Sequence, residues 1–201
     1  MFVTYSPPNM KKLLIKLIFC FFILVSLSFD IPKGWFIAGA TPSDYEMGID
    51  PGSGQAGGNA ATIKSKKDKA KSWATLMQDF NPGKYLAKKI KMTAYMKTKD
   101  VKTKAAFWLR VDQSGSRSAL AFDNMMNRPI KGTTDWTKYE IVLAVPAKAS
   151  NIAYGALLGG PGQIWFDNFS FEVVDDVTPT TNLTKDRDSQ QAEPFNVDFE
   201  K

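Results

Sequence analysis

The sequence predicts an all-β protein, an antiparallel β-sandwich, and the prediction rests mainly on its second half. Residues 139–145 and 152–158 alternate between two faces, and residues 164–174 are rich in aromatic and β-branched side chains. Pro146 ends the first run, and Gly159-Gly160-Pro161-Gly162 ends the second. Period-two runs separated by Pro and Gly clusters are typical of antiparallel strands with one buried face.

The first half offers further strands of the same kind. Residues 31–61 read as loop, apart from a short first strand expected at Trp35 and Phe36. Longer strands are expected at 72–80, 105–112 and 120–125. Residues 84–99 alternate as a strand does, although Leu86, Ile90 and Ala94 also have helical spacing. The all-strand neighbourhood favours a strand there. Residues 97–100, Lys-Thr-Lys-Asp, then read as a hairpin connection.

One set of motifs resembles the closing half of a galactose-binding-like jelly roll, the fold of many carbohydrate-binding modules and of accessory domains in secreted bacterial proteins. The motifs are Trp136-x-x-Tyr139, Pro146, Gly160-x-Gly162 and Trp165-Phe166-Asp167-Asn168. The resemblance covers roughly residues 35–174, and it implies a jelly roll. It also implies a structural calcium ion near Asp167, because related domains often use an acid at this position. The alternative is that Asp167 caps a turn or pairs with a lysine. No other cofactor is expected.

The ends of the chain predict export and a four-part organisation. Residues 1–28 read as a signal peptide whose true start is Met10, with a basic beginning, a short apolar run and cleavage before Phe29. An uncleaved anchor is the alternative. After cleavage no membrane span is expected, and the protein would be periplasmic or extracellular. Residues 29–176 form the β-sandwich domain, and the polar residues 177–193 read as a disordered linker.

Residues 194–201 return to period two, with Phe195, Val197 and Phe199 on one side. We expect this strand-like segment to fold back and dock as an edge strand near Trp35. The alternative is that it begins a second domain.

The candidate binding residues lie on the 105–112 strand. Trp108, Arg110 and Asp112 alternate onto one face, opposite the apolar residues of the same strand. An indole can stack on the apolar face of a sugar ring, and charged planar groups can bind neighbouring hydroxyls. A covered surface Trp beside a solvated ion pair is the alternative. Tyr45, Asp123 and Met125 are expected at the rim of this site.

Composition limits the other function classes. The chain has no histidine, which removes the commonest general base and metal ligand. Removing residues 1–28 takes away three lysines and no acid, so the net charge falls from +6 to a mild +3. Lys89, Lys91 and Lys97 can form a basic stripe beside Tyr95 that meets an anionic surface, or simply a solvated sheet face. Lysine rather than arginine argues against nucleic acid.

The sequence therefore predicts an exported, non-catalytic domain that recognises a carbohydrate. One alternative is an envelope scaffold or protein-interaction domain without a small ligand. A second is a carboxylate-dependent glycoside hydrolase that uses Asp112 with Asp123, or Glu140 with either of them. No nucleophile elbow, zinc motif or phosphate-binding loop is present in the sequence to support other chemistry.

Overall fold

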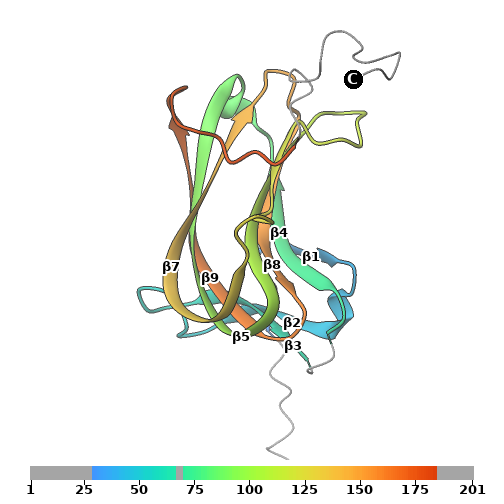
Figure 1. The fold of residues 1–201 in the computed structure, drawn as a ribbon, viewed down its shortest axis with the longest axis vertical. Helices are drawn as coiled ribbons and strands as arrows, with labels where there is room; N and C mark the ends of the chain where they lie inside the picture. Colours follow the sequence, from blue (N-terminus) through green and yellow to red (C-terminus); the bar gives the residue numbers. More distant parts are fainter. Residues whose placement is uncertain (1–28, 67–69, 185–201) are drawn as a thin grey trace, which may run out of the picture.

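Nine strands and two short 3₁₀ helices make up residues 29–66 and 70–184, the part of the chain that this computed structural model describes (Figure 1). The predicted signal peptide and the 194–201 segment lie outside the described residues. In chain order the elements are β1 (Phe36–Gly39), η1 (Pro42–Asp44), β2 (Tyr45–Asp50), β3 (Ala60–Ser65), β4 (Trp73–Phe80), η2 (Gly83–Tyr85), β5 (Lys88–Asp112), β6 (Ala121–Asp123), β7 (Ile130–Val145), β8 (Asn151–Gly159) and β9 (Gln163–Val174). The predicted antiparallel β-sandwich of jelly-roll type is confirmed.

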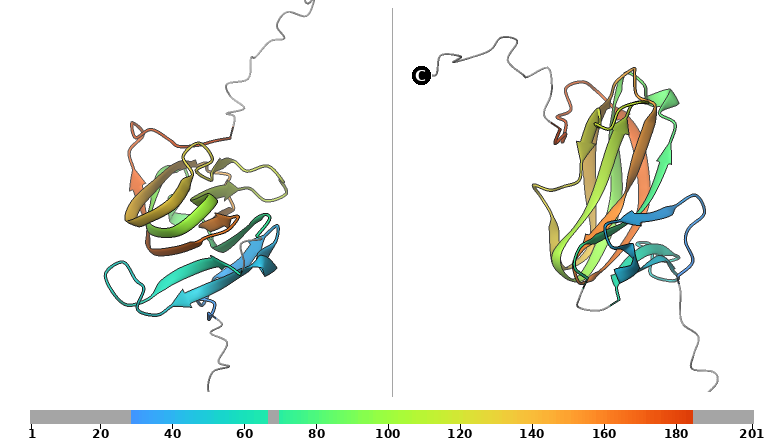
Figure 2. Two further views of the ribbon diagram at one scale, coloured as in Figure 1. Left: turned by 60° about the horizontal axis from the view of Figure 1, so that its bottom comes forward. Right: turned by 90° about the vertical axis from the view of Figure 1, so that its right-hand side faces the viewer.

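The long strand β5 belongs to both layers of the sandwich, which Figure 2 shows from two sides. Its second half, from Lys104 to Asp112, pairs with β8 and β6, while its first half, from Lys88 to Lys99, pairs with β7 and β9. The first layer therefore runs β1-β4-β8-β5-β6 and the second runs β7-β5-β9-β3-β2. All strand pairs are antiparallel.

Aromatic rings fill the space between the two layers. Phe107 of β5 and Tyr154 of β8 come from the first layer, and Phe166 and Phe169 of β9 come from the second. Phe169 packs edge-on against both Phe107 and Tyr154, with ring centroids 5.2 Å apart in each case. The positive φ of Asn168, 58°, shifts the alternation of β9 by one residue, so that Phe166 and Phe169 both face this core.

Two sequence predictions about the strands were wrong. Residues 97–100 are no hairpin, because β5 continues through them with irregular pairing and a left-handed Asp100 at φ 53°. A left-handed residue inside a strand bends it as a bulge does, and here the bend carries β5 from one layer to the other. Residues 31–61 contain more than loop, since β2 and the start of β3 lie there.

Residues 177–184 differ from the disorder expected of the segment 177–193. Thr181 donates its backbone N–H to Val142 O of β7 (2.9 Å), and Leu183 donates its N–H to Phe122 O of β6 (2.7 Å). In return, the Phe122 N–H donates to Asn182 Oδ1 (3.0 Å). The segment is ordered because these strand edges carry backbone groups that need hydrogen-bond partners. We call residues 177–184 the strap.

Candidate functional site

A hollow of about 610 Å³ lies on the outer face of the first layer, opposite the core. Its floor and walls come from β1, β4, β8, β5 and the β6 region, and we call it the groove. The lining residues are Ala38, Trp73, Thr75, Met77, Asp79, Lys104, Trp108, Arg110, Asp112, Phe122, Asn124, Asn151, Ala153 and Leu157. The groove therefore brings together the three residues that the sequence placed on one strand face, Trp108, Arg110 and Asp112.

Small residues in the middle strand produce the hollow. Ala153 and Gly155 of β8 lie between taller side chains on both neighbouring strands, because Gly155 pairs with Trp108 of β5 and with Met77 of β4. Residues directly opposite one another in antiparallel strands point to the same face. The side chains are thus short along this part of β8 and longer along β4 and β5, and this difference in size forms the groove.

Trp108 crosses the floor of this groove. Its Nε1 donates to Thr75 Oγ1 on β4 (2.9 Å), although Trp108 itself is on β5 and β8 lies between these strands. The indole must therefore extend over β8, where Gly155 leaves room for it. Thr75 Oγ1 donates its own proton to Ala156 O (2.7 Å), so its lone pair faces Trp108. With 8% of its surface exposed, Trp108 forms the floor rather than an open platform.

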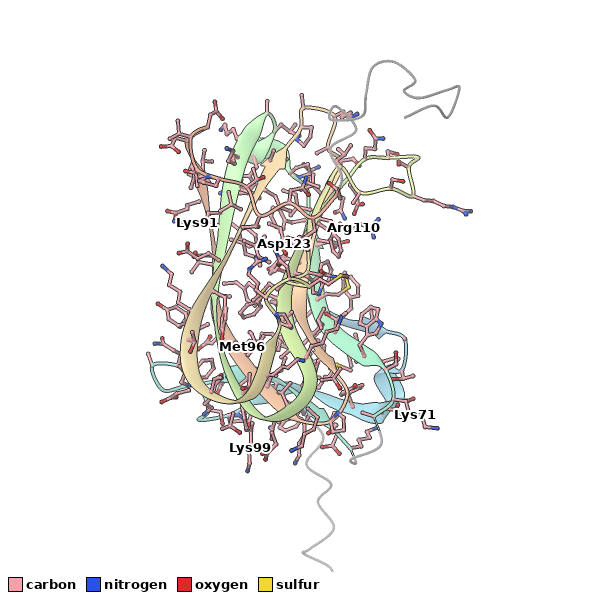
Figure 3. All side chains as sticks on the ribbon, in the orientation of Figure 1. Lys71, Lys91, Met96, Lys99, Arg110 and Asp123 are labelled. Carbon is pink, nitrogen blue, oxygen red and sulfur yellow. The ribbon has the colours of Figure 1, made fainter. Side chains whose placement is uncertain are left out.

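Charged and amide groups gather at one end of the groove. Arg110 Nε donates to Asp112 Oδ1 (2.8 Å), and its Nη2 donates to Arg117 O (3.3 Å), which holds the guanidinium in place (Figure 3). Asp79 faces Arg110 across Ala153 of the intervening strand, because both pair with that residue. Asn151, the partner of Asp112, adds an amide. This end of the groove therefore places several hydrogen-bond donors and acceptors close together.

The opposite wall is aromatic and was missed by the sequence reasoning. Trp73 of β4 lines the groove and is 40% exposed, far more than Trp108. It shares strand parity with Thr75, Met77 and Asp79, which also line the groove. The alternation within β4 indicates that these four side chains share one face. It does not indicate that this face lies beside Trp108 of β5, because that depends on β8 pairing between the two strands. Of the aromatic residues that line the groove, Trp73 is the most exposed and therefore the most available to a ligand.

Three predicted rim residues do not lie in the groove. Tyr45 is buried, and its hydroxyl donates to Ser72 O (2.8 Å) and lies 3.3 Å from Gly160 O, where it joins the two layers. Burial raises the pKa of this tyrosine above its ordinary value. Met125 is buried too, at 1% exposure. Both expectations are corrected.

Asp123 is the third correction, and the cause is its register. It pairs with the core residue Leu109, so its side chain faces inward and is fully buried. There it forms an ion pair with Arg128 (2.6 Å) and accepts the Met125 N–H (2.7 Å). A buried carboxylate needs such partners.

The carboxylates suggested for glycoside hydrolysis do not converge. Asp112 lines the groove, whereas Asp123 faces the core in its pair with Arg128. Glu140 lies on β7 of the other layer, 3.2 Å from Lys138. The glycosidase pairs proposed from sequence are therefore wrong, because a pair must flank one bond of one substrate.

The donor set around Asp167 does not by itself fit calcium. One carboxylate oxygen accepts the Gln55 N–H (3.1 Å) and the other accepts the Asn168 N–H (2.8 Å). Within residues 29–66 and 70–184, no three acidic, histidine or cysteine side chains gather to hold a metal ion. Calcium prefers six or more oxygen ligands. A calcium ion at Asp167 stays an untested prediction.

The three lysines of the predicted basic stripe each contact different groups of the protein. Lys89 Nζ donates to Asp176 O (2.7 Å) and Thr178 O (2.6 Å), and Lys91 pairs with Glu172 (2.6 Å). Hydrogen bonding to Glu172 raises the pKa of Lys91. Lys97 lies instead between Trp136 and Trp165, 5.4 and 4.9 Å from their ring centroids. An anionic partner for this stripe remains untested.

The fold is a jelly roll, and proteins of known structure that share it include carbohydrate-binding modules. The chain resembles the CBM22-1 xylan-binding domain of Paenibacillus barcinonensis Xyn10C, with a TM-score of 0.52 and 12% identity over 73% of this chain and 90% of that one. It also resembles the CBM22-1-GH10 modules of Clostridium thermocellum Xyn10B complexed with xylohexaose (TM-score 0.51, 14% identity, 70% of this chain, 26% of that one). A Stig cyclase, Fisc from Fischerella sp. TAU, has the same architecture (0.50, 16%, 76% and 93%).

In sequence, the chain is similar to an uncharacterized HTH-type transcriptional regulator, YbfP of Bacillus subtilis. The two are 43% identical over 169 residues, which are 84% of this chain. The chain spans 57% of the length of that relative. No protein-family model matches the chain. Among the described residues, no helix has the length and apolar character needed to cross a membrane.

Proposed function

We propose that this protein is an exported, non-catalytic binding domain that holds an uncharged carbohydrate chain in the groove. The observation that carries the proposal is the meeting, in one trough, of an exposed indole, Trp73, with a cluster of fixed polar groups around Arg110. A pyranose ring has apolar faces and a polar rim, so it matches both kinds of wall. The xylan-binding domain of similar fold supports the same class of ligand.

The charges in the groove favour a neutral ligand. Lys104 and Arg110 are its two cations, and Asp79 and Asp112 are its two anions. A trough with balanced charges gives no net attraction to an acidic or a basic polymer. Arg110 and Asp112 already satisfy one another in part, so they are suited to share hydrogen bonds with hydroxyl groups rather than to transfer protons.

The test is calorimetric titration with xylohexaose, cellohexaose and mannohexaose, after a glycan array has chosen among wider classes. We expect Trp73→Ala to weaken binding roughly 10- to 100-fold, by analogy with base stacking on aromatic side chains. Trp136→Ala removes an indole from the other layer and is the matched control, for which affinity should not change.

Two results would end the proposal. One is the absence of any glycan ligand, which would favour an envelope scaffold. The other is the release of new reducing ends from a bound oligosaccharide, which would make the protein a hydrolase.

A second candidate function is suggested by the similarity to the Bacillus regulator. The groove would then sense a small ligand inside the cell, for a protein whose other part binds DNA. Fractionation of cells that express the full chain distinguishes the two candidates. Recovery outside the cytoplasm, with a mature protein that begins near Phe29, supports the exported binding domain. Recovery of the uncut chain from the cytoplasm supports the sensor.

A further inference from the structure

One end of the sandwich is built around the turn between β8 and β9. Gly160 donates its N–H to Ser72 O (2.8 Å), at the start of β4. Ser65, the last residue of β3, donates its N–H to Gly162 O (2.9 Å), and its Oγ accepts the Gly162 N–H (3.1 Å). Lys102 donates its backbone N–H to Pro161 O (3.0 Å) at the bend of β5. Three parts of the chain that are far apart in sequence therefore meet at this turn.

Six lysines surround the turn. Lys64 and Lys66 flank Ser65, and Lys71 precedes Ser72. Lys104 pairs with Gly159, and Lys99 pairs with Gln163, so both lie beside the ends of the same turn. Lys102 completes the set. Figure 3 shows two of them, Lys71 and Lys99, at the lower end of the molecule. We call this surface the lysine end; its members are Lys64, Lys66, Lys71, Lys99, Lys102 and Lys104.

The lysine end carries an excess of positive charge. Four acids of the described residues lie beside it by pairing, position or a shared hollow. They are Asp44, whose carbonyl accepts the Lys66 N–H, Glu46, which pairs with Lys64, Asp100, and Asp135, which lines one hollow with Lys99. Within residues 29–66 and 70–184, none of the six ammonium groups lies within 4.0 Å of a carboxylate. The three arginines of this part of the chain, Arg110, Arg117 and Arg128, lie elsewhere, in or beside the first layer's β5–β6–β7 connections.

This composition matches a diffuse anionic surface better than a defined anion. Lysine is a flexible point charge, whereas arginine supplies the planar fork that binds a single phosphate or carboxylate in two places. Clusters of lysines at a surface attract anionic phospholipids without needing fixed geometry.

The start of the described chain lies near the same end. Phe29 packs against Gly48 of β2, and Asp30 O accepts the Ile49 N–H (2.8 Å). β2 begins at Tyr45, whose hydroxyl reaches Gly160 in the turn. Figure 1 shows β2 and β3 at the lower end of the sandwich. The residues that precede Phe29 in sequence include the apolar run Leu-Ile-Phe-Cys-Phe-Phe-Ile-Leu-Val at 17–25. In the uncleaved chain, which is the alternative to the mature protein that begins at Phe29, this apolar run is joined to the domain beside the lysine end.

We propose that the lysine end docks on a membrane surface that contains anionic phospholipids. The docking surface is separate from the glycan site except for Lys104, which lies at the border of both. It would orient the groove sideways to the membrane, because the groove opens on the face of the first layer rather than at its end.

The experiment uses the full chain with two kinds of vesicle, phosphatidylcholine alone and phosphatidylcholine mixed with phosphatidylglycerol. The apolar N-terminal run can bind either kind, so the measured quantity is the ratio of the two affinities, determined by co-sedimentation. The test variant carries Lys64→Gln, Lys99→Gln and Lys102→Gln. Each lysine is expected to contribute roughly fivefold, so the preference for anionic vesicles should fall by about a hundredfold.

The control variant removes the same charge from the opposite end of the sandwich, with Lys84→Gln, Lys88→Gln and Lys148→Gln. It should keep most of the preference, and both variants should keep the glycan affinity and thermal midpoint of the parent chain. Equal binding of the parent chain to both vesicles overturns the proposal, and so does an equal loss in the control. A short DNA duplex that binds more tightly than the anionic vesicles, and displaces them, would assign the lysine end to nucleic acid instead.

Discussion

The Thr75 hydroxyl determines how the floor of the groove is arranged. It is 2% exposed and serves two partners at once, since it accepts from Trp108 Nε1 and donates to Ala156 O. Because the hydroxyl has a single proton, the carbonyl fixes the direction of that proton and leaves a lone pair for the indole. One threonine therefore fixes the direction in which Trp108 lies.

Thr75→Val should lower the free energy of unfolding by about 1–3 kcal/mol. Valine has the same shape but cannot accept a hydrogen bond, so the mostly buried indole N–H would be left without its partner. Urea unfolding measures the change, and near-UV circular dichroism reports any movement of Trp108. Thr75→Ser keeps the acceptor and should retain most of the stability. A valine variant as stable as the parent would show that the hydrogen bond has no net effect on stability.

The strap acts at the scale of whole elements. It bridges two strand edges, β6 in the first layer and β7 in the second, and so closes one side of the sandwich. Unpaired strand edges are sites of aggregation and fraying, which proteins commonly protect with a covering segment. Since Phe122 of β6 also lines the groove, the strap helps to hold one wall of the candidate site.

Asn182→Ala should speed amide hydrogen exchange at Phe122 and lower stability by about 1 kcal/mol. The Asn182 side chain is the acceptor for that amide, so its removal opens the edge of β6 to water. Exchange followed by mass spectrometry measures the effect. Thr178→Ala alters only the turn with Asp175 and is the matched control. Unchanged protection at Phe122 in the Asn182 variant would mean that the strap does not stabilise β6.

At the scale of the whole molecule, the buried Tyr45 and Tyr154 and the half-buried Tyr139 make stability depend on alkaline pH. Burial raises the pKa of Tyr45, Tyr139 and Tyr154 above their ordinary value of 10.0. A raised pKa in the folded state means that the folded protein holds these protons more tightly than the unfolded chain does. The stability linked to them is therefore fully present below the unfolded pKa, and it is lost as the pH rises toward and through the folded values.

The free energy of unfolding should thus decrease steadily from about pH 10 upward, where unfolded tyrosine begins to ionise. Urea titrations from about pH 8 to about pH 12 measure this slope. Tyr45→Phe loses the hydroxyl contacts to Ser72 and Gly160, so it should be less stable at neutral pH but show a shallower alkaline slope. A slope unchanged by the substitution would show that Tyr45 is not among the groups that titrate.

Periodicity recovered the strands whose alternation is unbroken. Residues 139–145 and 152–158 lie within β7 and β8, and the alternation of β5 correctly grouped Trp108, Arg110 and Asp112. It failed where backbone irregularity interrupts the pattern. Asp100 adopts a left-handed conformation inside a continuous strand, so a polar Lys-Thr-Lys-Asp stretch was interpreted as a turn.

The remaining errors concern pairing, which a single sequence does not specify. Asp123 was placed outside on the parity of its own strand, but its register against Leu109 directs it into the core. Trp73 was missed because the groove combines β4 with β5, and β8, which follows both by some 40 residues or more, lies between them. Local patterns determine which side chains share a face, and long-range pairing determines which faces meet.

The position of β5 has a consequence for how the chain folds as it is made. Every strand with which β5 pairs, from β6 to β9, follows it in the sequence. A newly made β5 is thus a long strand with alternating apolar residues that has no partner until β6 and β7 have been made. It lacks β8 and β9 until residues 151–174 have emerged. Long-range strand pairing of this kind forms slowly, and until it forms the unpaired edges of β5 are prone to aggregation. A synthesis that stops before β9 would therefore yield an aggregation-prone fragment rather than a smaller domain, because β5 would lack one of its partners.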